Sequence, residues 1–334
     1  MISKKIRIFF CKVFPCCISF GILLGFCVRN NNFLNLINIF PRIHIVYFFL
    51  SILSIFIYWL TDSLVLREFL PGLSNSVWSY LKITMYGQFY GSITPFFSGH
   101  QTSQLLLLKN KGINTGKSIS VLSQKFCISQ WWTVIISSLS LIFKSKKFRD
   151  QIPGFVFFTL IGLAIQCSGI LLVIVCYLNK KKVMNLANWF LKLGEKVKIV
   201  KDYNKISKSL EDQLEFLMKN NLSINCGISV YIYCLAQNIS YCMVAFFISK
   251  AFGCPGFPIF DFIAAQSFVN LISIANPLPG SAGTVEASFL FLYKDFFDKS
   301  NISFAMILFR LINYYFGVIV GFFVVLFSKK NRAN

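Results

Sequence analysis

The sequence predicts an all-α fold, a polytopic transmembrane helical bundle that forms a single integral membrane domain over residues 1–334. Hydrophobic residues make up 56% of the chain and charged residues only 13%. The mean hydropathy is +0.65. Apolar runs of about 20 residues recur along the chain, and a helix needs about that length to cross roughly 30 Å of hydrocarbon. This composition argues against an ordinary soluble enzyme.

About six of these runs are long enough to span a bilayer. The first follows the basic residues Lys4, Lys5 and Arg7, and no small-residue cleavage site comes after it, so we expect a retained span instead of a signal peptide. The fourth is the most apolar, with Gln166 as its only strongly polar side chain. The predicted spans are residues 8–28, 43–66, 118–143, 152–177, 224–249 and 302–327.

The distribution of Lys and Arg predicts the orientation of the chain. Cytoplasmic loops retain an excess of these residues. If the N-terminus is cytoplasmic, the segments on the same side, chiefly 67–117 and 180–219, carry most of the basic residues. We therefore expect a multi-pass protein of the cell membrane with both termini in the cytoplasm. The basic segment 144–149 then lies outside, which argues against this topology.

Residues 179–222 form a basic insert after the fourth span. Lysines 180–182 open it, and apolar residues then recur at helical spacing. We expect a cytoplasmic amphipathic insert on anionic headgroups; a plain solvated loop is the alternative. The net charge of +21 accompanies an abundance of Lys, Phe, Ile and Asn that an AT-rich genome would produce, so we expect no nucleic-acid partner.

The sequence does not predict catalytic residues, a metal site or a cofactor. The 11 cysteines lie mostly in apolar runs without a CxxC pair, and the 2 histidines, His44 and His100, are far apart. These patterns fit neither a zinc site nor a nucleophilic triad.

Two apolar segments are broken by proline and glycine. They are GQFYGSITPFFSGHQ at residues 87–101 and NPLPGSAGTVE at residues 276–286. Proline removes a backbone donor, and broken backbone at membrane depth is tolerated only where protein or a watery cavity satisfies its polar groups. We therefore predict two re-entrant helical hairpins.

The two broken segments are related in spacing. In each, a proline precedes a glycine by the same number of residues, and a cation follows within the next span. The matching residues are Pro95, Gly99 and Lys125 in the first half, and Pro279, Gly283 and Arg310 in the second. With an odd number of spans per half, this pattern predicts an inverted repeat of residues 8–143 and 152–327, with the binding site where the broken helices meet. The alternative is a chance coincidence of two Pro/Gly-rich hairpins.

Lys125 and Arg310 are cations within predicted spans, which favours a functional role, although long basic side chains can also snorkel to the interface. Glu286 either pairs with one of these cations or occupies a helix N-terminus, and the two roles are compatible. Asn276 and Gln101 either bind a ligand or cap the broken helices. For His100 we favour a structural role. The candidate lipid-binding residues are Lys125, Arg310, Glu286, Gly99, Gln101, Asn276, Gly280 and Gly283.

These same segments resemble a known family. Residues 87–130, with the first broken segment, the KGI that follows it and Lys125, resemble the first signature of the lysylphosphatidylglycerol synthase transmembrane-region family, also called the flippase-like membrane domain. Residues 276–321, with NPLPGSAGTVEASF and a later NYY, resemble the second. The family usually has Gly-Gly-Gln-Pro where this sequence has GHQT at 99–102. The similarity covers nearly the whole chain.

The resemblance implies translocation of phosphatidylglycerol, aminoacylated or not, or of a related anionic lipid across the bilayer. In full-length members a C-terminal acyltransferase-like domain attaches lysine from lysyl-tRNA. This sequence ends soon after its last span, so we expect lipid handling without aminoacyl transfer, with Lys125 and Arg310 forming a cationic pocket for an anionic phospholipid.

Two alternatives stay open. The first is phosphatidylglycerol lysyltransferase activity, alone or with a separately encoded aminoacyltransferase as partner. The second is a structural protein that recruits a glycolipid-synthesising enzyme through residues 179–222.

Overall fold

The computed structural model describes residues 43–150, 152–178, 226–254, 256–299 and 301–330, together with residues 21, 185, 188 and 189. Within these residues the chain is helical, with no β-strand. The span predicted at 8–28 and the insert at 179–222 lie outside the described residues, apart from those four single positions.

Five helical segments in the described chain are long and apolar enough to cross a membrane. They correspond to five of the predicted spans and confirm the membrane helical bundle. Their bounds are Ile45–Phe69 for α3, Thr115–Phe148 for α6, Phe155–Leu178 for α7, Ile228–Ala251 for α10 and, for the last, Ile302–Ser328.

The sequence predicts one continuous span at 302–327, but this last segment is not one regular α-helix. It consists of α13 (Ile302–Arg310), a π-helical turn (Leu311–Tyr315) and α14 (Phe316–Lys330). A π turn inserts an extra residue into the helical repeat and re-aims the side chains around it. The turn begins directly after Arg310, and sequence periodicity gave no sign of it.

The predicted end of the third span also needs correction. We expected a loop after residue 143, but α6 continues to Phe148. Lys144 and Lys147 therefore project from its C-terminal turns, where the helix dipole favours cations. Their ammonium groups lie 2.7 and 2.6 Å from the carboxylate of Asp261, at the start of α11 (Ile259–Ser273). This shared carboxylate compensates two of the four cations in the basic segment 144–149.

The first broken segment folds as a helix–turn–helix. It comprises α4 (Val77–Ser92), a 3₁₀ turn (Pro95–Phe97) and α5 (Gly99–Asn110). The α4 helix ends before Pro95 because a residue that precedes proline disfavours the helical conformation. The Thr94 hydroxyl then bridges the break, since it donates to the Tyr90 carbonyl and accepts from the Gly99 N–H, both at 2.8 Å.

The second broken segment has the same order of elements. It comprises α11, a 3₁₀ turn (Pro279–Ser281) and α12 (Thr284–Leu292). The Asn276 side chain holds the break together, since its amide donates to the Ala282 carbonyl and the Thr284 hydroxyl, both at 2.9 Å. Both helical hairpins that Pro and Gly predicted are therefore present.

The two turns also share an unusual backbone conformation. In both, the second and third residues have positive φ: 52° and 56° at Phe96 and Phe97, and 61° and 48° at Gly280 and Ser281. Positive φ strains a bulky residue such as phenylalanine. The turns lie against each other in the folded chain. The Tyr314 hydroxyl, from the π turn, donates to the Ser92 carbonyl at 2.9 Å and ties the end of α4 to the other half.

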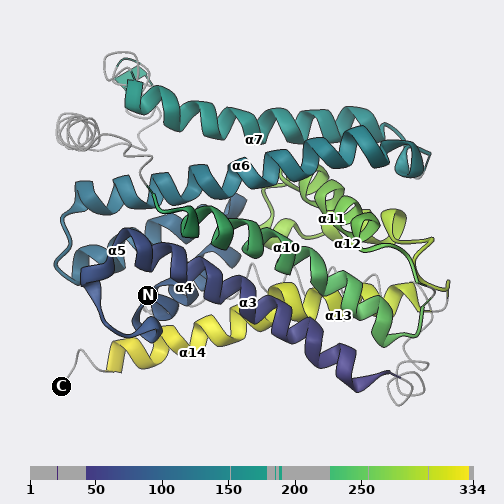
Figure 1. Ribbon diagram of the computed structural model, residues 1–334, viewed down its shortest axis with the longest axis horizontal. Helices are drawn as coiled ribbons and strands as arrows, with labels where there is room; N and C mark the ends of the chain where they lie inside the picture. Colours follow the sequence, from purple (N-terminus) through teal and green to yellow (C-terminus); the bar gives the residue numbers. More distant parts are fainter. Residues whose placement is uncertain are drawn as a thin grey trace, which may run out of the picture.

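The helices of the two halves pack reciprocally (Figure 1). The α3 and α10 helices lie side by side in the middle, while α4 packs on α14 and α11 packs on α6. The α4–α5 hairpin lies toward one end of the long helices and the α11–α12 hairpin toward the other (Figure 1). This arrangement supports the inverted repeat, although the repeat bounds of 8–143 and 152–327 stay a prediction.

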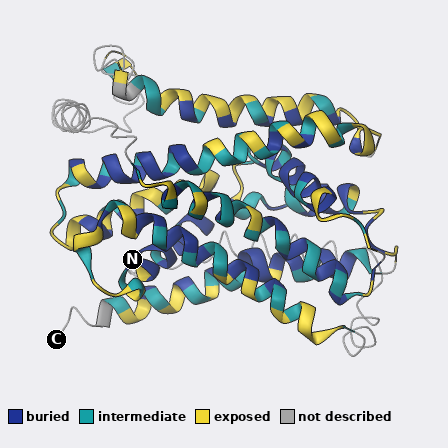
Figure 2. Cartoon of the chain, viewed as in Figure 1, coloured by how far each residue is buried: buried dark blue, intermediate teal, exposed yellow. Residues whose placement is uncertain are grey.

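Buried phenylalanines around α11 and α12 form the largest apolar cluster, and α7 lies on the outside of the bundle. Figure 2 shows many exposed positions along α7. Phe157, Leu160 and Leu171 are among the exposed apolar residues of this helix. Large exposed apolar side chains along a membrane-length helix are suited to lipid contact. We infer that α7 faces the hydrocarbon.

The contact between α7 and α11 generates a test of this packing. A Cβ added at Gly162 would lie 2.1 Å from the backbone oxygen of Leu271, whereas one at Gly169 on the same helix would lie 3.6 Å from Phe126. We expect Gly162→Ala to destabilise the protein by about 1–3 kcal/mol, because the α11 backbone has to move. Thermal unfolding in detergent measures this, with Gly169→Ala as the matched control. Equal melting temperatures for both variants would contradict the packing.

Candidate functional site

Two adjoining cavities lie where the broken hairpins meet the long helices. The larger measures about 730 Å³ and contains residues of the first turn and α5 in its wall. The smaller measures about 380 Å³ and is lined by the second turn and the region around Arg310. Their walls share Tyr58, Gln130, Gln166 and Gln237. Ligand sites are usually lined mainly by apolar side chains, so this concentration of amides and hydroxyls indicates a polar ligand or water.

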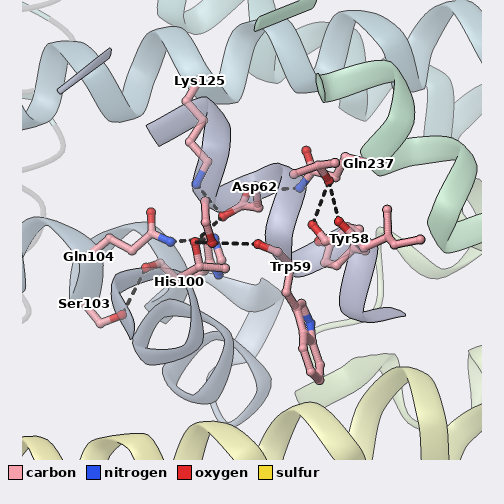
Figure 3. A network of polar contacts seen from close by, with 12 residues as sticks. Tyr58, Trp59, Asp62, His100, Ser103, Gln104, Lys125 and Gln237 are labelled. Carbon is pink, nitrogen blue, oxygen red and sulfur yellow. Dashed lines mark hydrogen bonds and ion pairs between the residues drawn. The ribbon is translucent and has the colours of Figure 1, made fainter. Parts of the chain in front are cut away.

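An ion pair stands in the wall of the larger cavity. The Lys125 ammonium on α6 lies 2.6 Å from the Asp62 carboxylate on α3, and both side chains are buried. Asp62 also accepts from the Thr84 hydroxyl at 2.9 Å and from the Gln237 amide at 3.0 Å. Figure 3 shows Lys125 and Gln237 approaching Asp62 from different helices. Moving a charged group from water into the protein interior costs free energy. These three donors compensate that cost for the Asp62 carboxylate.

His100 lies beside this cluster. Its ring stacks on Phe97, with 5.0 Å between ring centroids, and its Nε2 atom lies 3.2 Å from the Gln104 amide nitrogen. These contacts fit the structural role that we favoured for His100, and the residue also forms part of the wall of the larger cavity.

A second ion pair borders the smaller cavity. The Arg310 Nε atom lies 2.7 Å from Glu286 Oε1, with the side chains 4% and 0% exposed. Glu286 Oε2 accepts the Gly283 N–H at 2.7 Å, at the start of α12. Glu286 thus makes both contacts that the sequence allowed, one with a cation and one at a helix N-terminus. Arg310 Nη1 also donates to the Gly280 carbonyl at 3.0 Å.

Several buried polar atoms around the smaller cavity have no hydrogen-bond partner among the described residues. Arg310 Nη2 is one, and both amide atoms of Asn313 are others. The other unpaired atoms in this wall are Gln88 Oε1, Ser273 Oγ and Gln166 Oε1. An unpaired buried polar atom costs about 1–3 kcal/mol, so such a cluster indicates a place for water or a polar ligand.

The charges of the two cavities balance within the described chain. Lys125 faces Asp62 and Arg310 faces Glu286. The expected cationic pocket is therefore not present as such, because each cation already has a carboxylate. Both cations are also held inside the protein by these ion pairs, so neither has to snorkel to the interface.

Four of the predicted site residues line the cavities. Lys125 and Gln101 belong to the wall of the larger cavity, and Arg310 and Gly280 to that of the smaller. Gly280 is required for steric reasons, since an added Cβ would lie 2.3 Å from the Tyr314 ring.

The other four predicted residues support the walls. Gly99 and Asn276 hold the two breaks through the hydrogen bonds described above. Gly283, at φ 89°, adopts a conformation that L side chains rarely reach. Glu286 orients Arg310, and it does not line either cavity.

Asp62 is the main site residue that the sequence reasoning missed. It lies in the predicted span 43–66, where a carboxylate is as costly as a cation. Applying the argument used for Lys125 and Arg310 to acidic residues would have found it. Gln237, Asn313 and Gln130 are also part of the cavity walls, and a single amide in an apolar run is a much weaker signal.

The Asp62–Lys125 pair predicts a specific pattern of stabilities. Asp62→Asn leaves a buried cation without its counter-charge and should destabilise the protein by about 3–5 kcal/mol. Adding Lys125→Met removes that charge and should restore much of the loss. Thermal unfolding in detergent compares the single and double variants with Asp150→Asn, a change at an exposed position. A single variant as stable as the parent would show that the pair is not buried.

Comparisons with known proteins agree with this architecture. The family model described as "Lysylphosphatidylglycerol synthase TM region" matches residues 12–321. A UPF0104 membrane protein of Archaeoglobus fulgidus is 24% identical over 286 residues, which cover 84% of this chain and 85% of that protein. No solved structure matches. The chain therefore belongs to the lysylphosphatidylglycerol synthase transmembrane-region family, a family of membrane proteins.

Proposed function

We propose that this protein moves the headgroup of phosphatidylglycerol, aminoacylated or not, or of a related anionic phospholipid, across the bilayer. The observation that carries the proposal is the unpaired Nη2 atom of Arg310, buried at the wall of a polar cavity between two broken helices. A guanidinium with a free N–H offers a charge-assisted hydrogen bond to a phosphate oxygen, which is among the stronger polar contacts in proteins.

The rest of the cavity wall suits the remainder of such a headgroup. Unpaired amide atoms of Asn313 and Gln88 offer hydrogen bonds of both polarities to glycerol hydroxyls. A polar cavity lowers the cost of bringing a headgroup to membrane depth, because contacts with the protein replace contacts with water. The outer surfaces of the helices are apolar, so the acyl chains can stay in the hydrocarbon while the headgroup enters the cavity.

The arrangement of the hairpins supports movement between the two faces of the membrane. Inverted repeats allow a transporter to open alternately when one half rocks against the other around a fixed site. Here the hairpins lie toward opposite ends of the long helices (Figure 1). Their turns contact each other and contribute residues to the cavity walls. In our proposal the protein lies in the cell membrane with both termini in the cytoplasm, as the distribution of Lys and Arg predicts.

The lysyltransferase alternative rests on the family description alone. No contact in the described residues favours it over translocation.

Arg310 provides the direct test. Replacing arginine alone would leave Glu286 buried without its cation, so we combine Arg310→Met with Glu286→Gln, whose amide oxygen can still accept the Gly283 N–H. In vesicles that contain fluorescent phosphatidylglycerol, the double variant should translocate this lipid about ten- to a hundredfold more slowly, since a charged hydrogen bond contributes about 1.5–3 kcal/mol. The rate is measured from the change over time in the fraction of label that a membrane-impermeant quencher can reach.

The matched control is Lys144→Met, which removes a cation that lies outside both cavities. It should translocate the lipid at the parental rate. Equal rates for the parent and the double variant would exclude Arg310 from the mechanism. No translocation by the parent would refute the proposed function.

A further inference from the structure

The two ion pairs differ in how they relate to the cavities. Asp62 and Lys125 both line the larger cavity, so both ends of that pair are open to its contents. Glu286 lines neither cavity, and its second oxygen is held by the backbone of Gly283. The Arg310–Glu286 pair is therefore built into the second turn, whereas the Asp62–Lys125 pair can be separated without breaking a helix start.

We propose that Asp62 is a proton-binding site that couples uptake of one lipid anion to uptake of one proton. This inference rests on the proposed function and names its co-transported ion.

Charge balance is the physical reason. With both cations already paired, an anionic phosphate would add an uncompensated negative charge to a low-dielectric cavity, at a high cost in free energy. A proton from the adjoining water that binds Asp62 makes this side chain neutral. The Lys125 ammonium is then free to bind a phosphate oxygen, and the cavity as a whole stays neutral. Release of the lipid on the other side returns the proton to water and re-forms the ion pair.

The hydrogen-bond partners of Asp62 are compatible with both its ionised and its protonated form. The Thr84 hydroxyl lies 2.9 Å from Asp62 Oδ2 and 3.2 Å from the Ser63 hydroxyl. A hydroxyl can donate and accept, so Thr84 donates to the carboxylate and can accept from the protonated acid, with its own proton turned toward Ser63. Gln237 donates to the other oxygen, Oδ1, at 3.0 Å in either state.

Other titratable groups near Asp62 have to be considered. They come from each neighbouring helix that supplies one: Tyr58 from α3, His100 from α5, Lys125 from α6 and Cys234 from α10. Asp62 is the one carboxylate in the described walls of the two cavities, so it is the group whose neutralisation releases a cation. His100 would instead add a positive charge when protonated, without releasing Lys125.

The direct measurement is proton uptake on binding. The purified protein in detergent and weak buffer receives dihexanoyl-phosphatidylglycerol, a short-chain probe, while a pH indicator reports protons. We expect about one proton to be taken up per bound lipid. Asp62→Asn should abolish the uptake. The control Asp261→Asn changes a carboxylate that also pairs with lysines but lies outside both cavities, and it should keep the uptake.

A second measurement uses vesicles with an imposed pH gradient, in which lipid translocation should run faster from the acidic to the alkaline side than in reverse. If Asp62→Asn does not fold, the proton uptake and the gradient response of the parent protein still decide whether lipid movement is coupled to a proton. Translocation by the parent without proton uptake and without a gradient response overturns the coupling and leaves the proposed function standing. If the parent neither binds the probe nor translocates lipid, both proposals fall.

Discussion

A helix that breaks at membrane depth leaves backbone groups and nearby charges that only the protein itself can compensate, and this requirement organises the fold. The two breaks are held by side chains of their own hairpins, Thr94 in one and Asn276 in the other. The breaks then meet, so each half closes the polar region opened by the other. The hydrogen bond from the Tyr314 hydroxyl to the Ser92 carbonyl is one of those that join the two halves.

The same requirement explains why the charges occur in pairs. Each buried cation has a carboxylate within 2.7 Å, and neither pair has an exposed side chain. Pairing makes the interior stable without a ligand, and it also means that an incoming anion has to be balanced by another change. One pair is fixed in a turn and the other faces the cavity. In our proposals Arg310, which retains a free N–H, therefore anchors the lipid, and Asp62 alters the charge balance.

Much of the architecture could be predicted from the sequence, because apolar length and Pro/Gly breaks are local signals. The long helices and both hairpins follow from such signals, as does the position of Lys125 and Arg310 inside the helical bundle. The partners of these cations could not be predicted in the same way. Asp62 lies 63 residues from Lys125 and 175 from Gln237 in the chain, and one sequence carries no sign of such contacts. The π turn after Arg310 and the continuation of α6 through its lysines were also missed, since tertiary contacts such as that with Asp261 determine them.

The claim on which the account depends is that the two hairpins enter the membrane from opposite faces and meet in the middle. It can be tested with single cysteines in a background without the 11 native ones. Lys111 follows α5 and Lys299 follows α12, and both are exposed. In sealed vesicles of known orientation, a membrane-impermeant thiol reagent should label Lys111→Cys from one side only and Lys299→Cys from the other side only. Labelling of both positions from the same side would contradict the account.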